Sequence, residues 1–578
     1  MDNNTDSTDI LVIGCGGSGL RAAIEAKQNN LTVKVLGKRS KNDSHTVLAA
    51  GGINASFGNL DFEDSWEQHF ADTYLEGYEI GDPAAIELMA RNAPDSVKEI
   101  DSWGANFKKL YNGKFDQRYF GAHTFRRTCF SGDYTGKSIL NALLQKASLL
   151  DIQIHDSEYV TDLLISENKC FGAMSFDIFS GERTIHLANA VILCTGGHTR
   201  IWKKSSSRKM ENTGDGLFLG LKSGCELIDM EMVQFHPTGM LFPEDIEGTL
   251  VTEAVRGEGG RLFNAMGERF MKNYDIERLE LSTRDLVAKA NYTEIQEGRG
   301  TVRGGVLLDI SHIKKDTIIS RIPSTYKQFL EFQNIDISKT PMEVAPTAHY
   351  SMGGISVKAA SHSTDIEGLF AAGEVAGGLH GANRLGGNSL AEILVFGKIA
   401  GAYASKYSKS SSYKDAPLSI IKSAHENIEK KLKKGSEDAN SLQNQLRDLM
   451  WEHCGVVKKR ESLKEGLNKI NILKNKLMHI CIRENNICDL IKTFDIEASL
   501  MTAEATILSA LTRNESRGAH NRDDYPRKDK KGFFNTKVKL KDNKLEIRKS
   551  NLNKPSKELL KIIKETKEIN NFSDKLLE

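Results

Sequence analysis

This sequence of 578 residues lacks grouped cysteines, long apolar runs and a large net charge. None of its eight cysteines forms a C-x-x-C pair; they are Cys15, Cys129, Cys170, Cys194, Cys225, Cys454, Cys481 and Cys488. Iron–sulfur clusters and structural zinc sites require grouped thiolates, so the sequence predicts no metal site of its own. We expect these cysteines to be reduced and mostly buried.

The other two absences limit how the chain can meet a membrane or a nucleic acid. No apolar run approaches the ~18–20 residues of a membrane-spanning helix, and the opening MDNNTD is unlike a signal or transit peptide. The 78 basic and 77 acidic residues give a formal charge of +1, which leaves no overall field to attract nucleic acid. We expect a cytoplasmic protein with no nucleic-acid partner and no membrane span, whose contact with the cytoplasmic face of a membrane is made through partner subunits.

The N-terminal segment has the pattern of a dinucleotide-binding strand, turn and helix. An apolar run, Ile10–Ile13, leads into Gly14-Cys-Gly16-Gly-Ser-Gly19 and then into an alanine-rich, helix-favouring stretch. Gly14 permits the turn, Gly16 lets backbone N–H groups approach a pyrophosphate, and Gly19 lets the helix pack closely on the strand. A second apolar strand follows at residues 32–36, so we predict a dinucleotide site.

The residues after this second strand leave the choice of dinucleotide open. An acidic side chain commonly stands there and binds a ribose hydroxyl, whereas this sequence has Gly37-Lys38-Arg39. By charge alone, the two cations favour the phosphate of NADP.

The next segment points to FAD. Ser44-His45-Thr46, with Gly51-Gly52 shortly after, resembles the flavin-attachment segment of the flavoprotein subunit of succinate dehydrogenases and fumarate reductases. In that family the histidine after the serine is bonded covalently to FAD, so the resemblance implies attachment at His45. The alternative is a loop histidine hydrogen-bonded to the backbone. The neighbouring FAD contacts that the resemblance implies are Lys38, Ser44, Thr46, Gly51 and Gly52.

Five separate segments combine glycine-rich bends with cations or imidazoles. They are residues 234–239, 250–260, 282–285, 347–354 and 381–390. Taken singly, each has a structural explanation, such as a buried histidine, a helix cap or a surface arginine. Together and in this order they resemble the same family, and the resemblance extends from about Asp9 to about Pro526.

The resemblance assigns substrate contacts within these segments. It implies that His236, Thr252, His349 and Arg384 hold the two carboxylates of a C4 dicarboxylate. A dianion that leaves water needs fixed donors, and an arginine gives two parallel charge-assisted hydrogen bonds to a carboxylate. Binding both ends of the substrate also positions its central carbons.

The resemblance also implies a proton route through Glu253, Arg256 and Arg284. We expect Arg284 to donate the proton to fumarate and to take it from succinate, with Glu253 and Arg256 relaying it to solvent. The alternative is that Arg284 only stabilises charge that develops on the carboxylate.

Further FAD contacts are implied nearer the C-terminus of this region. Glu374 follows a predicted strand and, by the resemblance, contacts the ribityl chain, while Ser389 and Leu390 lie beside the isoalloxazine ring. Asp215 opens a predicted helix, and we expect it either to cap that helix or to face the flavin.

Two segments are interpreted from polarity. The adjacent cations Arg126 and Arg127 are expected to be solvated and are assigned no chemistry. The polar segment 515–526 is expected to form an interface that approaches the flavin edge.

These patterns predict an α/β protein. A Rossmann-type FAD-binding domain occupies two segments, residues 1–231 and 349–409, and is interrupted by a capping domain at residues 232–348. Leucine and isoleucine spacings of three, four and seven predict a helical domain at residues 410–526. A small C-terminal domain, residues 527–578, is expected to contain two short strands and a peripheral helix.

The predicted reaction is the interconversion of succinate and fumarate by hydride transfer between a substrate carbon and the flavin. Because the chain has no cysteine cluster, we expect an iron–sulfur partner subunit, with a membrane-anchor subunit completing the assembly. One alternative is an FAD enzyme for another dicarboxylate such as L-aspartate, which would lack the attachment histidine. Another is an electron-transfer protein that holds FAD without turnover. Ala50 stands where the family has Gln or Glu before the Gly-Gly pair, so the direction of the reaction is not indicated.

Overall fold

The computed structural model describes residues 4–411, 416–432, 435–483 and 486–576, with side chains described as far as residue 568. Its largest sheet contains β1 (Asn4–Ile13), β2 (Val33–Leu36), β6 (Gln153–His155), β7 (Glu158–Ser166), β8 (Lys169–Asp177), β9 (Arg183–Leu193) and β16 (Leu369–Ala371). The strand order is β6-β2-β1-β9-β8-β7, with β16 also paired to β9. The strands from β6 to β9 and β16 run parallel, whereas β7, β8 and β9 form an antiparallel meander.

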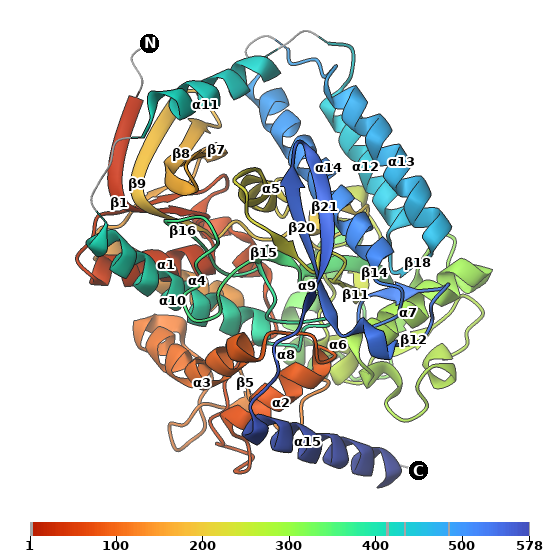
Figure 1. The fold of residues 1–578 in the computed structure, drawn as a ribbon. Coiled ribbons are helices and arrows are strands. Elements are labelled where there is room, and N and C mark those ends of the chain that lie inside the picture. Colours follow the sequence, from red (N-terminus) through yellow and green to blue (C-terminus); the bar gives the residue numbers. More distant parts are fainter. Residues whose placement is uncertain (1–3, 412–415, 433–434, 484–485, 577–578) are drawn as a thin grey trace.

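The glycine turn joins β1 to α1 (Gly17–Gln28), as the sequence predicts. β1 is longer than the predicted run, because residues 4–8 pair with residues 184–188 of β9. These added residues are mostly polar, so backbone pairing rather than an apolar pattern forms this part of the strand. α1 packs against α10 (Asn388–Ser410), and the two helices lie side by side against the sheet (Figure 1).

More helices and three short strands pack around α1 and α10. α1 also contacts α4 (Thr135–Leu149), and α10 contacts α3 (Pro83–Ile100), which packs on α2 (Trp66–Glu76). β3 (Ile53–Asn54), β5 (Thr128–Cys129) and β4 (Gln117–Arg118) form a small sheet beside them. Apolar residues of these helices and of the large sheet form one continuous core.

A second sheet has four antiparallel strands. They are β11 (Val233–Met240), β14 (Met342–Ser351), β13 (Val306–Asp309) and β12 (Arg261–Phe263), in that order. α7 (Arg284–Glu294) packs on β11 and β14. The same part of the chain contains α6 (Ala254–Gly257), α8 (Lys315–Arg321) and α9 (Pro323–Gln333). In the pairing of β11 with β14, His236 lies opposite Thr347, which brings it close to His349.

The predicted helices after residue 410 are present. α12 (Ala439–His453), α13 (Arg460–Leu477) and α14 (Ile487–Thr512) pack on one another, and α11 (Leu418–Lys431) packs on β7. Residues with the predicted spacing, such as Leu442, Leu446 and Ile470, are buried between the helices.

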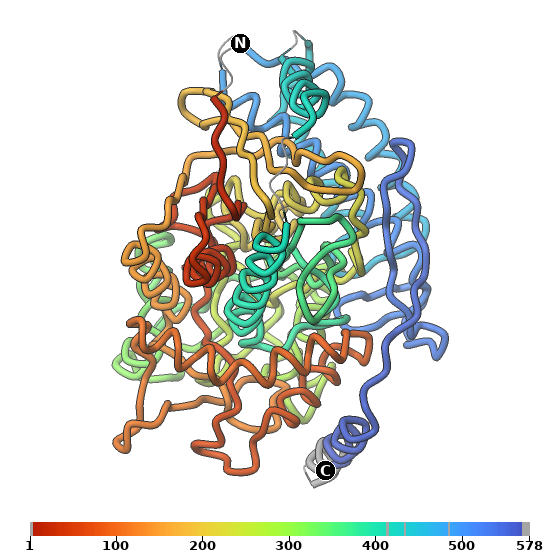
Figure 2. Tube along the Cα trace, turned by 60° about the vertical axis from the view of Figure 1, so that its left-hand side comes forward, coloured from red at the N-terminus to blue at the C-terminus, as the bar shows by residue number. Residues whose placement is uncertain are grey.

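The C-terminal segment forms the two predicted strands, β20 (Phe534–Lys541) and β21 (Lys544–Asn551), followed by α15 (Lys557–Leu576). The hairpin extends a sheet that contains β10 (Leu227–Ile228), β15 (Gly354–Ser356) and β17 (Ala376–Gly377). After the hairpin the chain runs along one side to the lower end of the molecule (Figure 2), and α15 packs on α2. The division into domains remains a prediction; β14 crosses the proposed boundary at residue 348.

Among the described residues, none of the helices combines the length and apolar character that a membrane crossing needs. In that same part of the chain, histidine, cysteine and acidic side chains form no group of three or more that could hold a metal ion.

Candidate active site

A cavity of about 770 Å³ extends from the glycine turn after β1 to the paired strands β11 and β14. A volume of this size is typical of sites for cofactors and small molecules. Every predicted site residue lines it except Gly19, which packs behind the turn, and Arg256, which lies behind Glu253. The cavity therefore joins the predicted dinucleotide residues and the predicted substrate residues in one space.

Close packing explains the glycines of the turn. Gly14 has a φ of +117°, and a Cβ there would lie 2.0 Å from the carbonyl oxygen of Cys194. A Cβ on Gly19 would lie 1.8 Å from the carbonyl oxygen of Gly14. The turn is held against the following loop by the N–H of Gly17, which donates to Oγ1 of Thr46 at 3.0 Å. The first residues of α1 thus face the cavity with their backbone, an arrangement that suits a pyrophosphate.

Lys38 does not provide a free charge for the extra phosphate of NADP. Its Nζ lies 2.9 Å from Asp215 and 3.3 Å from Asp495. Burial would lower the pKa of Lys38, but these two carboxylates outweigh burial and raise it. Arg39 is also paired, with Asp43 and Glu211. Asp215 does not cap its helix, α5 (Asp215–Lys222), because Gly214 occupies the N-cap position.

Several polar atoms of the cavity wall have no hydrogen-bond partner among the described residues. They include Oγ of Ser44, Oγ1 of Thr195 and Oδ1 of Asp215, all of them buried. Buried polar atoms normally have a partner, so a polar ligand or water must satisfy them. Together with the glycine turn, this donor and acceptor set fits the diphosphate and sugar portions of FAD.

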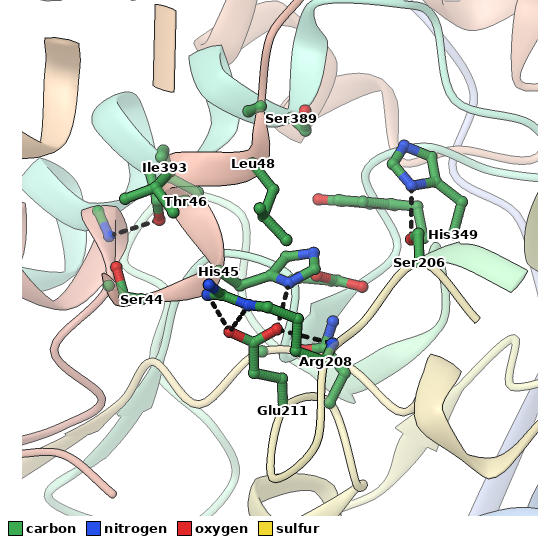
Figure 3. A pocket seen from close by; sticks show the side chains of 18 of the residues that line it. Ser44, His45, Thr46, Leu48, Ser206, Arg208, Glu211, His349, Ser389 and Ile393 are labelled. Atoms are coloured by element: carbon green, nitrogen blue, oxygen red, sulfur yellow. Dashed lines mark hydrogen bonds and ion pairs between the residues drawn. The ribbon is translucent and has the colours of Figure 1, made fainter. Parts of the chain in front are cut away.

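His45 lies on the cavity wall in contact with Glu211. Its Nδ1 is 3.0 Å from Oε2 of Glu211, whose other oxygen faces the guanidinium of Arg208 (Figure 3). Burial would lower the pKa of His45, but the carboxylate of Glu211 outweighs burial and raises it, with Glu374 adding to the effect and Arg208 opposing it. For Glu374 burial acts in the other direction and raises the pKa to about 7, although the charge of His45 opposes it.

The substrate end of the cavity contains two neutral imidazoles. The rings of His236 and His349 meet edge to face at 5.5 Å, and Nδ1 of His349 is 3.0 Å from Oγ of Ser206. Burial lowers the pKa of both histidines well below the ordinary value, and nearby arginines lower it further. Thr252 lines the same end of the cavity. These rings can donate or accept hydrogen bonds without adding charge.

Arg384 is the cation that faces this end without an acidic partner in salt-bridge contact among the described residues. It donates to Oε1 of Gln234 at 2.9 Å and stacks on the ring of Tyr350 at 4.4 Å. Its Nε has no partner in that part of the chain. Burial, and then the charge of Arg284, lower the pKa of Arg384 to about 10, so it stays charged at neutral pH.

Arg284 and Glu253 form an ion pair at this end of the cavity. Nε of Arg284 donates to Oε2 of Glu253 at 2.7 Å, and Nη2 of Arg256 lies 3.7 Å from the other oxygen. Burial would raise the pKa of Glu253, but the two guanidinium groups outweigh it and lower the pKa to about 2. Glu253 is therefore ionised at rest, and with Arg256 and Arg284 it carries a formal charge of +1.

Two interpretations from polarity were wrong. Arg127 is fully buried, with Asp64 and Asp72 each 2.8 Å from its guanidinium, so only Arg126 is partly solvated. None of the residues 515–526 lines the cavity; Arg517 and Glu515 instead form a buried ion pair. A dense polar segment is compatible with either an interface or a buried network, and its partners decide which forms.

Sequence reasoning also missed residues in and around the cavity. Glu211 contacts His45, and Arg208 contacts Glu211; both line the cavity. Gln234 does not line it, but its Oε1 accepts hydrogen bonds from Arg384 and Arg284, which do. Glu211 is 166 positions from His45, so no local spacing could have indicated this contact.

Comparisons with known proteins agree with this geometry. Residues 9–390 match the family described as FAD binding domain, and residues 443–562 match the family described as fumarate reductase flavoprotein C-term.

Relatives and solved structures cover almost the whole chain. The sequence is 43% identical over 529 residues to a subunit of the fumarate reductase (CoM/CoB) of Methanothermobacter marburgensis, and the match covers 91% of this chain and 96% of that protein. It is 36% identical over 556 residues to the succinate dehydrogenase flavoprotein subunit of Rickettsia bellii, with 91% and 92% covered. A structure of E. coli quinol fumarate reductase superposes with a TM-score of 0.91 at 31% identity, covering 96% of this chain and 99% of that one.

Proposed function

The chain belongs to the family of flavoprotein subunits of succinate dehydrogenases and fumarate reductases, and from this membership we propose which of its residues interconvert the two dicarboxylates. It is an FAD-dependent oxidoreductase, and when bound, FAD supplies the two-electron chemistry of the reaction. The observation that carries the proposal is the convergence of cations and neutral imidazoles in the same cavity as the glycine turn.

FAD is held along the first part of this cavity. The backbone N–H groups at the start of α1 bind the diphosphate, and His45 forms the covalent bond to the flavin. Glu374, Ser389 and Leu390 contact the remainder of the cofactor. Their position on the cavity wall supports these roles.

The dicarboxylate binds at the other end. Arg384 pairs with one carboxylate, and His236, His349 and Thr252 donate the additional hydrogen bonds. The formal charge of +1 on Arg384 and the +1 on the group around Arg284 together balance a dianion. Since His236 and His349 are neutral, they orient the substrate without overcompensating its charge.

Arg284 transfers the proton. Its contact with Glu253 fixes the guanidinium at the cavity wall, and Arg256 behind Glu253 continues the route away from the substrate. Free guanidinium has a pKa above ~12, so Arg284 can act only if it is reprotonated quickly. Glu253 and Arg256 supply that proton.

Two further components of the assembly are proposed, namely an iron–sulfur partner subunit, which accepts or delivers electrons, and a membrane-anchor subunit. Support comes from the relatives, which are themselves named as subunits, and from the absence of grouped cysteines in the sequence. Assembly with such partners would place the chain at the cytoplasmic face of a membrane.

Dye-coupled assays of the FAD-loaded chain test this function. We expect fumarate reduction with a reduced viologen dye and succinate oxidation with an oxidised dye, and the ratio of the two rates gives the preferred direction. L-aspartate should not replace succinate. Oxidation of L-aspartate at the succinate rate, or no dicarboxylate turnover by the FAD-loaded chain, would refute the assignment; dye without substrate is the control.

A further inference from the structure

Glu211 lies between His45 and two arginines, with its side chain only 4% exposed. Oε2 accepts the backbone N–H of Arg208 at 3.0 Å and lies 3.0 Å from Nδ1 of His45. Oε1 faces the guanidinium groups of Arg208 and Arg39, at 2.5 and 3.4 Å. Both oxygens contact Arg208, but only Oε2 is directed at the imidazole of His45.

This arrangement keeps Glu211 ionised. Burial would raise its pKa, but His45 and Arg208 outweigh burial and lower the pKa far below the ordinary value. An ionised carboxylate only accepts hydrogen bonds, so the hydrogen in this contact belongs to Nδ1 of His45. In a neutral imidazole with its hydrogen on Nδ1, the lone pair is on Nε2. Figure 3 shows the His45 ring with one nitrogen towards Glu211 and the other directed away from it.

We propose that Glu211 is the positioning residue for covalent attachment of the flavin to His45. It fixes the tautomer whose Nε2 is nucleophilic, orients the ring, and stabilises the imidazolium that forms with the new bond. The inference rests on the proposed attachment of FAD at His45.

Attachment exchanges one bond of the flavin for another. Nε2 forms a C–N bond to a methyl carbon of the flavin ring system, one C–H bond of that methyl breaks, and its proton leaves. The electron pair of the C–H bond remains on the flavin. Fumarate, the oxidised substrate of the family reaction, then takes these two electrons, the methyl proton and the Nδ1 proton of the imidazolium, and becomes succinate. Glu211 compensates the positive charge of the imidazolium until that proton is lost.

The test follows covalent attachment rather than turnover. FAD and fumarate are added to chain produced under flavin limitation, in an extract of the producing cells so that any attachment factor is present. Total bound flavin is measured on the native protein, and covalent flavin by fluorescence of the 64.1 kDa band after denaturation in acid. The ratio of covalent to total flavin over time is the readout, because a purely structural defect would lower both together.

Three substitutions separate the possibilities. Glu211→Gln keeps the size but removes the charge, and Glu211→Asp keeps the charge but withdraws it from Nδ1. Asp43→Asn is the matched control, because Asp43 pairs with Arg39 and Arg208 from the other side and does not contact His45. We expect both Glu211 variants to slow attachment by about tenfold or more, consistent with loss of a charge-assisted hydrogen bond, and Asp43→Asn to attach at the unmodified rate.

Glu211→Gln that attaches flavin at the unmodified rate overturns the inference. If Glu211→Gln binds no FAD, Glu211→Asp decides, and an unmodified ratio there overturns it equally. Attachment slowed as much by Asp43→Asn would show a general effect of the charge cluster and would also overturn it. His45→Ser distinguishes the underlying assignment: covalent flavin that survives this substitution would refute attachment at His45 itself.

Discussion

The two histidines at the proposed substrate end are uncharged, although the substrate that we propose there is an anion. Burial and the surrounding guanidinium groups lower the pKa of His236 and His349 well below the ordinary value. The positive charge is therefore concentrated on arginine, whose fork matches a carboxylate. At the level of single residues, we propose that the arginines compensate the charge of the substrate and that the two neutral histidines orient it.

Arg284 offers the sharpest test among the residues. Arg284→Gln should abolish turnover in both directions while FAD remains bound. Binding of the dicarboxylate should only weaken, because Arg384 and the histidines still hold it. Arg303→Gln is a matched control: it also breaks a pair with a glutamate, Glu343 at 3.1 Å, but lies outside the cavity. If Arg284→Gln kept a tenth or more of the rate, an effect of only about 1.4 kcal/mol, the role of proton donor would have to be abandoned.

Asp64 gives a prediction for pH dependence. Burial raises its pKa to about 6, since Arg127 is shared with Asp72 and cannot compensate both carboxylates. The folded chain then retains a proton that the unfolded chain has already lost. Stability from this group should be greatest below about pH 4 and should fall as the pH rises to about 6, by up to about 3 kcal/mol.

Thermal melts of the unmodified chain and of Asp64→Asn at about pH 4 and about pH 6 check this expectation. Their difference in melting temperature should change sharply between the two conditions. Asp61→Asn is the control: the hydrogen bond from Arg126 lowers the pKa of Asp61, so its titration lies below about pH 4 and its difference in melting temperature should change little between the two conditions. Equal differences for Asp64→Asn at both pH values would show that its pKa is not raised.

At the scale of elements, paired strands and turns bring the predicted residues together. His236 and His349 come from β11 and β14, and the hydrogen-bonded register of these strands places the two rings in contact. The sequence could predict the glycine turn, because at Gly14 and Gly19 a side chain would clash with the neighbouring backbone. It could not predict that strand pairing extends β1 to Asn4, since those residues carry no apolar pattern.

The C-terminal helix α15 is attached more firmly than its lysine-rich sequence suggests. Leu559 and Ile563 are each only 4% exposed, and Nε2 of Gln68 in α2 donates to Oγ1 of Thr566 at 3.1 Å. Leu559→Ala should weaken docking by about 2 kcal/mol. That loss corresponds to roughly 30-fold faster hydrogen exchange of the α15 amides.

Leu560→Ala is the control for this helix, because Leu560 is 47% exposed. Its exchange rates should stay within about twofold of the unmodified chain. Equal acceleration by the two substitutions would mean that α15 is not docked through Leu559.

At the scale of the whole molecule, one cavity is assembled from segments hundreds of positions apart. Motifs with fixed local spacing, such as Ser44-His45-Thr46 and the turn at Gly14, could be recognised one at a time. The contact of Glu211 with His45, the burial of Arg127, and the position of residues 515–526 away from the cavity depend on tertiary packing. Polarity alone cannot tell a solvated cation from one that is enclosed by two carboxylates.

The FAD-loaded chain should carry out dicarboxylate chemistry by itself, because one cavity contains both the residues proposed to bind the flavin and those proposed to bind the substrate. The most direct measurement is a single turnover: the FAD-loaded chain is reduced chemically without oxygen, excess reductant is removed, and fumarate is added in a rapid-mixing instrument. We predict that the flavin is reoxidised and that one equivalent of succinate forms per flavin. A flavin that stays reduced in the presence of fumarate, yet is reoxidised by a dye, would contradict this central claim.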